Sequence, residues 1–93
     1  MTGFRRPNPV FSTEYQALRD VVREARRAAK LSQRGLAARI GKEPSHVAMI
    51  ECGQRRIDSL ELYRMAKALG VPPAELFGRI AARLDTLDAA ARA

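Results

Sequence analysis

Apolar residues recur at intervals of three or four positions along most of the 93-residue chain, which is the spacing of amphipathic helices. The first such segment starts near Ser12 or Thr13, where Thr13 and Gln16 have the spacing of a capping box, and it runs to about Lys30. One face of this segment is charged, and its apolar stripe consists of Leu18, Val21, Val22, Ala25 and Ala29. A first helix is therefore expected over about 12–30.

Local signals divide the following segment into two short helices. Ser32 is suited to cap the first of them, and Leu31 and Leu36 have the spacing of a hydrophobic staple. This helix is expected to end at Gly41, since glycine readily takes the left-handed conformation that closes a helix. Pro44 suits the first turn of the next helix, which is expected to stop at Gly53.

The second half of the chain predicts two more helices. Asp58 and Glu61 have the spacing of a capping box at the start of a helix that ends at Gly70. The last helix is expected from about Pro73 to about Ala90, with an apolar stripe of Leu76, Phe77, Ile80, Leu84 and Leu87. Residues 1–11 contain Pro7 and Pro9 and predict an extended arm instead of a helix.

Composition supports an all-α fold, because the chain contains 16 alanines and 9 leucines. Charge adds a clue to function. The 17 Lys and Arg residues exceed the 10 Asp and Glu residues by seven. Residues 1–56 carry 12 basic and 5 acidic side chains, whereas residues 57–93 carry 5 of each. The excess charge lies entirely in the first part and implies a polyanionic partner there.

Several classes of protein are excluded by what the sequence lacks. Cys52 is the only cysteine and His46 the only histidine, so neither an internal disulfide nor a Cys/His zinc site can form. No nucleophile or paired carboxylate accompanies His46, which argues against an enzyme, and no cofactor motif is found. No apolar run reaches the roughly 18 residues of a membrane span. The N-terminal cations are not followed by the apolar segment that a signal peptide requires. A cytoplasmic protein is expected, with no metal, no cofactor and no evident small-molecule effector.

Two short helices joined by a glycine turn within a basic region indicate a helix-turn-helix. Residues suited to the contact between two crossing helices are Leu36, Ala37, Ile40, Gly41, Val47 and Ile50. The segments LSQRGLAARIG, IECG and SLELYRMAKALGVPPAELF, from Leu31 to Phe77, resemble phage-repressor and Cro-like proteins, the xenobiotic-response-element (XRE) family. This resemblance implies a five-helix, lambda-repressor-like DNA-binding domain over 12–77. An N-terminal arm would precede it, and 78–93 would lengthen the last helix as a dimerisation element.

In this family the third helix enters the major groove, so the resemblance implies base contacts by Pro44, Ser45, Ala48 and Met49. Helical steps of 100° place Ser45, Ala48 and Met49 on one face, away from Val47. Ser45 can bond to several bases, while Ala48 and Met49 offer apolar contact, most naturally to a thymine methyl group. Simple exposure to solvent is the alternative for Ser45 and Met49. The face carries no cation, so strong direct readout of bases is not expected from these four residues.

Phosphate contacts are therefore expected to supply most of the affinity. Gln33 matches the family position that bonds a phosphate, and His46 is expected to be exposed or to contact a phosphate. The cations that flank the same surface are Arg34, Lys42, Arg55 and Arg56. Each of them alone could be an ordinary solvated side chain. Arg5 and Arg6 are either a groove-binding arm or a disordered leader.

Two glutamates are in unusual positions. Glu43 stands where relatives more often have Ser or Thr as a helix cap, and a carboxylate repels phosphate. Glu43 either favours the helix dipole or accepts from a cytosine amino group. Glu51 falls in the last turn of the third helix, where the dipole disfavours an anion, and it points partly toward the core. A cation is expected beside Glu51, and by resemblance that cation is Arg26.

A single module of this size reads a short half-site, so a homodimer is expected on double-stranded DNA. Ile80, Leu84 and Leu87 could form the dimer contact, or the last stripe could fold back onto the first helix. The resulting hypothesis is a transcriptional regulator, a repressor in a bacterial or phage cytoplasm. Two alternatives stay open: an antitoxin-like module that also binds a partner protein, and a basic helical protein that binds RNA or an acidic partner.

Overall fold

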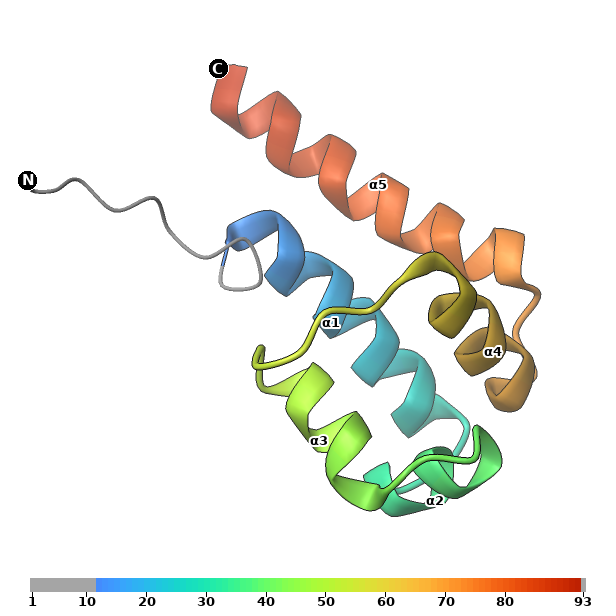
Figure 1. Ribbon diagram of the computed structural model, residues 1–93. Coiled ribbons are helices and arrows are strands. Elements are labelled where there is room, and N and C mark those ends of the chain that lie inside the picture. The colour runs from blue at the N-terminus through green and yellow to red at the C-terminus, as the bar shows by residue number, and fades with distance from the viewer. Residues whose placement is uncertain (1–11, 93) are drawn as a thin grey trace, which may run out of the picture.

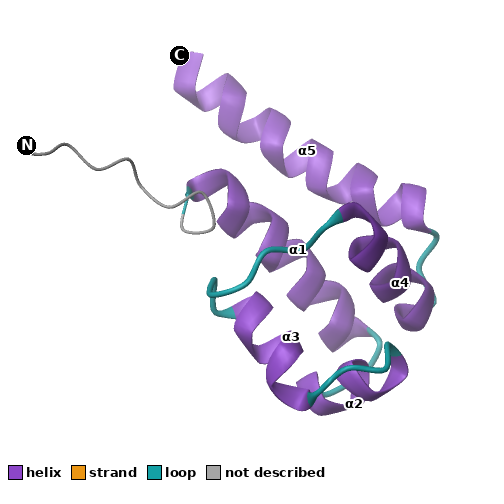
Figure 2. Cartoon of the chain, in the orientation of Figure 1, coloured by secondary structure: helices purple, strands orange, loops and turns teal. Residues whose placement is uncertain are grey.

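A computed structural model describes residues 12–92, which form five helices joined by short loops and no strand (Figures 1 and 2). The all-α, five-helix fold predicted from the sequence is confirmed over this range. None of the described helices is long and apolar enough to cross a membrane. The helices are α1 (Thr13–Ala28), α2 (Gln33–Arg39), α3 (Pro44–Glu51), α4 (Ser59–Leu69) and α5 (Pro73–Arg92).

Helix α1 is the central element of the packing. Helix α5 lies alongside α1, and α3 also contacts α1 (Figure 1). Helices α2 and α3 pack closely on each other, while α4 joins α2 to α5. The core has members from all five helices: Val21, Val22, Ala25, Leu36, Ala37, Val47, Ile50, Met65, Ala66, Leu69, Leu76 and Ile80.

Side-chain caps fix the starts of three helices. Ser32 Oγ accepts from the Gly35 amide at 2.9 Å, and Asp58 Oδ1 accepts from the Glu61 amide at 2.7 Å, as their sequence positions predict. At the start of α1 the cap is Ser12, whose Oγ accepts from the amide of Tyr15 at 3.1 Å. The capping box predicted from Thr13 is therefore wrong by one residue, because Thr13 is already inside the helix.

The helix ends follow the glycine signals. Gly41, Gly53 and Gly70 all have positive φ, at 70°, 90° and 74°. Helix α1 ends at Ala28, two residues before the predicted end, since Lys30 takes the left-handed conformation with φ 62°. The resulting loops are short, and they fix the relative placement of α1, α2 and α3.

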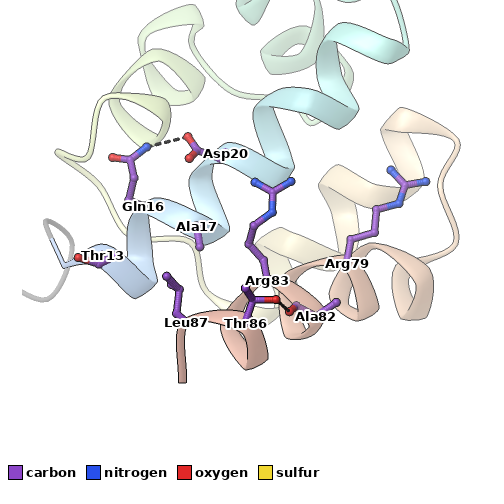
Figure 3. A pocket seen from close by; sticks show the side chains of 9 residues that line it. All are labelled: Thr13, Gln16, Ala17, Asp20, Arg79, Ala82, Arg83, Thr86 and Leu87. Atoms are coloured by element: carbon purple, nitrogen blue, oxygen red, sulfur yellow. Dashed lines mark hydrogen bonds between the residues drawn. The ribbon is translucent and has the colours of Figure 1, made fainter. Parts of the chain in front are cut away.

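The apolar stripe of α5 packs mainly on the chain's own core. Ile80 is fully buried and Leu84 packs against the core. Leu87 and Ala17 line a groove of about 560 Å³ between α5 and α1 (Figure 3). The prediction of Ile80 as a dimer contact is therefore wrong, because its side chain is enclosed by the protomer. The alternative, in which the stripe folds back onto the first helix, matches the placement of Leu84 and Leu87.

Candidate nucleic-acid interface

The pair formed by α2 and α3 is built around four side chains with no exposed surface. Leu36 and Ala37 of α2 meet Val47 and Ile50 of α3 in the core. The turn between the helices includes Gly41 in the left-handed conformation, and the Lys42 amide donates to the Ala37 carbonyl at 2.9 Å. The packing and the turn hold α3 at a fixed angle to α2.

The opposite side of α3 faces solvent. Pro44 and Ser45 are exposed, Met49 keeps 39% of its surface, and Ala48 is half-buried. The helical face predicted to point away from the core is thus the face that α3 presents. The solvent-facing side of a short helix is the part that can enter a groove about 12 Å wide.

Exposed cations flank this face along the chain. Arg34 lies in the first turn of α2, Lys42 lies in the turn between α2 and α3, and Arg55 and Arg56 follow α3. Arg55 Nη2 is 3.9 Å from a carboxylate oxygen of Glu61. Within residues 12–92, the side chains of Arg34, Lys42 and Arg56 make no hydrogen bond or ion pair, so these three charges are available to a ligand.

Glu51 anchors the end of α3 to α1 and α2. Arg26 Nε donates to Glu51 Oε2 at 2.6 Å, and Arg26 Nη2 donates to Oε1 at 2.9 Å. The pair inferred for Arg26 and Glu51 is present, with both side chains buried. Gln33 Nε2 also donates to Glu51 Oε1 at 2.9 Å, which gives this predicted phosphate ligand a second, structural contact.

Arg23 completes this network and was missed by sequence reasoning. Arg23 Nε lies 3.6 Å from Glu51 Oε1, and Arg23 Nη2 donates to the Glu51 carbonyl at 3.0 Å. Burial raises the pKa of the Glu51 carboxyl, but hydrogen bonds from Arg26 and Gln33 and the two arginine charges outweigh burial and hold that pKa below its ordinary value. Spacing along the helix could have identified Arg23 as a second partner of Glu51, because Arg23 lies one helical turn before Arg26.

The structure places His46 differently from the sequence prediction. Its side chain is only 10% exposed, and its Nε2 lies 2.7 Å from Glu61 Oε2 on α4. His46 was expected to be exposed or to contact a phosphate, but α4 covers the ring, so its observed contact is structural. Glu61 was assigned to a capping box; its amide binds Asp58, whereas its carboxylate binds His46.

A second group of residues ties the loop after α3 to α1. Arg19 is 3% exposed, stacks 5.8 Å from the Tyr15 ring centre and lies against Gly53. A β-carbon at Gly53 would come within 3.2 Å of the Arg19 guanidinium carbon. Tyr15 Oη accepts from the Ile57 amide at 2.6 Å. These contacts position the loop that carries Arg55 and were not predicted, because helical periodicity assigns Arg19 to a solvated face.

The remaining predicted sites are outside this interface. Arg5 and Arg6 lie outside the described residues. Among residues 12–92 no group of three or more His, Cys, Asp or Glu side chains could hold a metal ion. Cys52 is exposed near the end of α3, where its Sγ lies 3.5 Å from the Met49 carbonyl.

The comparison with protein families agrees with this geometry. The family model described as "Helix-turn-helix" matches residues 22–76, which span α2, α3 and α4 together with the last part of α1 and the start of α5. More than half of the chain is therefore covered by this match. A comparison with curated proteins gave no match.

Solved structures extend the likeness. An XRE-family like protein from Pseudomonas syringae pv. tomato is 39% identical, with a TM-score of 0.69 over 74% of this chain and 84% of the other. The restriction-modification controller protein C.AhdI from Aeromonas hydrophila is 34% identical, with a TM-score of 0.64 over 70% and 98%. The clp gene regulator ClgR from Corynebacterium glutamicum is 25% identical, with a TM-score of 0.72 over 87% and 85%. The chain therefore belongs to the XRE family of helix-turn-helix, DNA-binding transcriptional regulators.

Proposed function

We propose that this protein is a sequence-specific repressor that binds double-stranded DNA as a homodimer in the bacterial cytoplasm, with α3 in the major groove. The observation that carries the proposal is the exposed face of α3, bordered by Arg34, Lys42 and Arg56, which have no partner within residues 12–92. Exposed cations before and after an exposed helix face, with side chains unpaired within the described residues, fit a regular polyanion.

In this arrangement the two kinds of contact have separate roles. Pro44, Ser45, Ala48 and Met49 lie nearest the base edges, where Ser45 offers a hydroxyl and Met49 an apolar surface. The flanking cations neutralise phosphates and supply most of the affinity. Gln33 can contribute as well. One N–H of its side-chain amide donates to Glu51 Oε1, and the second N–H remains for a phosphate oxygen.

An exposed apolar surface on α4 and α5 supports self-association. Leu60, Tyr63 and Phe77 keep 58%, 51% and 55% of their surface exposed, and Tyr63 and Phe77 line one shallow depression. We call these three residues the α4–α5 patch. Contiguous patches of large, exposed apolar side chains are typical of interaction sites.

Charge favours a second copy of this chain as the partner on the α4–α5 patch. The seven excess positive charges all lie in residues 1–56, so two copies repel each other through that part. The patch belongs to residues 57–93, where basic and acidic side chains balance. Two copies that meet through the neutral part leave both basic faces free for DNA, as a two-fold symmetric operator requires.

Selection of bound sequences from random DNA duplexes, combined with sedimentation, tests the proposal. Wild type is expected to sediment as a dimer and to select two inverted half-sites spaced by about one helical turn. Phe77→Asp places a charge in the α4–α5 patch and is expected to yield monomers that select single half-sites at lower affinity. Ala90→Asp makes the same charge change at an exposed position near the end of α5 and serves as the matched control.

Three results would contradict parts of this proposal. Wild-type monomers at the concentrations that saturate DNA would contradict the homodimer. Co-purification of a different polypeptide that depends on Phe77 would instead support the antitoxin-like alternative. Equal affinity for duplex DNA and structured RNA, with no selected sequence, would leave only a basic interaction protein.

A further inference from the structure

The start of α3 differs from the starts of α1, α2 and α4 in its cap. Ser12, Ser32 and Asp58 each accept a hydrogen bond from an amide of their own helix. Glu43 occupies the same position before α3, with extended backbone angles of φ −65° and ψ 150°, but its side chain makes no cap bond. The Glu43 carboxylate is therefore left free at the end of the helix that faces DNA.

Glu43 has no other structural contact to explain its presence. The side chain is exposed and makes no hydrogen bond or ion pair with any residue in the range 12–92. Ser, Thr, Asp and Asn are better caps, since their shorter side chains reach the helix amides. A carboxylate beside Lys42 also weakens the attraction of this end for phosphates. Glu43 thus gives up a cap bond and opposes backbone binding.

We propose that Glu43 sets the sequence preference of the protein by accepting a hydrogen bond from the N4 amino group of a cytosine. The inference rests on the proposed function, in which the N-terminal end of α3 approaches the base edges. A carboxylate can only accept hydrogen bonds. It therefore complements the one base whose major-groove edge offers a donor and no acceptor.

The other three bases are disfavoured by the same chemistry. Guanine presents two acceptors, and thymine presents an acceptor and a methyl group. Adenine has an amino donor but also an acceptor nitrogen beside it. Only cytosine satisfies the carboxylate without a facing lone pair. Glu43 can therefore supply the strong readout that the outward residues Ser45, Ala48 and Met49 lack.

Repulsion between Glu43 and phosphates has a second consequence. On a non-cognate duplex the carboxylate finds no donor and remains close to the anionic backbone, so it lowers affinity there. On a cognate duplex the hydrogen bond to cytosine offsets this cost. Glu43 therefore increases the ratio of specific to non-specific binding in two ways: it strengthens binding to the cognate duplex and weakens binding to other duplexes.

The test is to compare the sequences selected from random duplexes by wild type, Glu43→Gln and Glu43→Ala. Wild type is expected to prefer cytosine about tenfold at one position of each half-site. Glu43→Ala should lose the preference at that position alone and bind non-cognate duplexes more tightly. Glu43→Gln, which matches the shape of the wild-type side chain, should favour adenine there, because an amide can bond both adenine groups. Glu75→Gln makes the same charge change at an exposed glutamate of α5 and is the matched control, which should leave the cytosine preference intact.

Two results would overturn the inference. Selected sequences that remain the same in wild type and both Glu43 variants, with preferences retained at other positions, would overturn the role of Glu43 alone. A wild type with no preference at any position would overturn the proposed function as well. Equal melting temperatures for wild type and Glu43→Gln verify that the comparison is made between folded proteins.

Discussion

Arg26→Ala is expected to lower the free energy of unfolding by about 3 kcal/mol, because it leaves the Glu51 carboxylate buried without its main partner. For a domain of this size such a loss lowers the melting temperature by roughly 15 °C. Arg23 and Gln33 still contact Glu51 in the variant, which places the effect at the low end for a broken buried pair. Thermal unfolding followed by circular dichroism at neutral pH measures it.

Arg83→Ala is the matched control, because Arg83 also joins two helices through a carboxylate. Arg83 Nη2 donates to Glu24 Oε1 at 2.8 Å, but both side chains are exposed. Solvent screens such a pair, so the melting temperature should hardly change. If Arg83→Ala lowered the melting temperature as much as Arg26→Ala, the importance of burial would be contradicted. An unchanged melting temperature for Arg26→Ala would contradict the role of the Glu51 network.

The pH dependence of the melting temperature is a second, independent test of the Glu51 network. The pKa of Glu51 is lower in the fold than its ordinary value of 4.5, so the network stabilises the protein above that value. This stability is lost as the pH falls through the lower folded-state pKa. The melting temperatures of wild type and Arg26→Ala should therefore converge in acid.

Replacing Arg34, Lys42 and Arg56 together by glutamine is expected to weaken binding to duplex DNA on the order of a hundredfold at physiological salt. Each lost phosphate contact should also reduce the slope of log affinity against log salt concentration by about 0.9. These three cations have no partners within the described part of the chain, so the fold should keep its stability. Fluorescence anisotropy of a labelled duplex at several salt concentrations measures both quantities.

A second triple variant with the same change of net charge shows whether position matters. Arg79, Arg83 and Arg92 are exposed on α5, and the first two pair with Glu75 and Glu24. Replacing them by glutamine should leave affinity and salt slope nearly unchanged, since charges beyond about 8 Å from the phosphates are screened. Equal losses in the two triple variants would show that only net charge matters and would contradict an interface at α2 and α3.

The features that sequence predicted well are set by local chemistry. Ser32 and Asp58 cap their helices because short polar side chains reach nearby amides, and Gly41 and Gly70 close helices because glycine tolerates positive φ. Glu51 was recognised as needing a cation because an anion at a helix C-terminus that faces the core is unfavourable. Rules that act within a few residues thus predicted the helices and one element of the interface.

The features that sequence missed depend on which helix faces which. Arg19 lies on the charged face of α1, yet the loop after α3 covers it. His46 was expected to be exposed or to contact a phosphate, but α4 supplies Glu61 as its partner. Ile80 has the periodicity of any apolar stripe, and only the packing of α5 along α1 decides that it is core. Periodicity places a side chain on a face of a helix but does not identify what covers that face.

The most direct test of the central claim is to titrate the 15N-labelled protein with a selected DNA duplex and follow its backbone amide resonances. The account predicts that the largest shifts fall in residues 33–35 and 44–49, at the start of α2 and the outer face of α3. The amides of residues 84–92 at the end of α5 should stay in place. Shifts confined to α4 and α5, with those of residues 44–49 unchanged, would contradict the account.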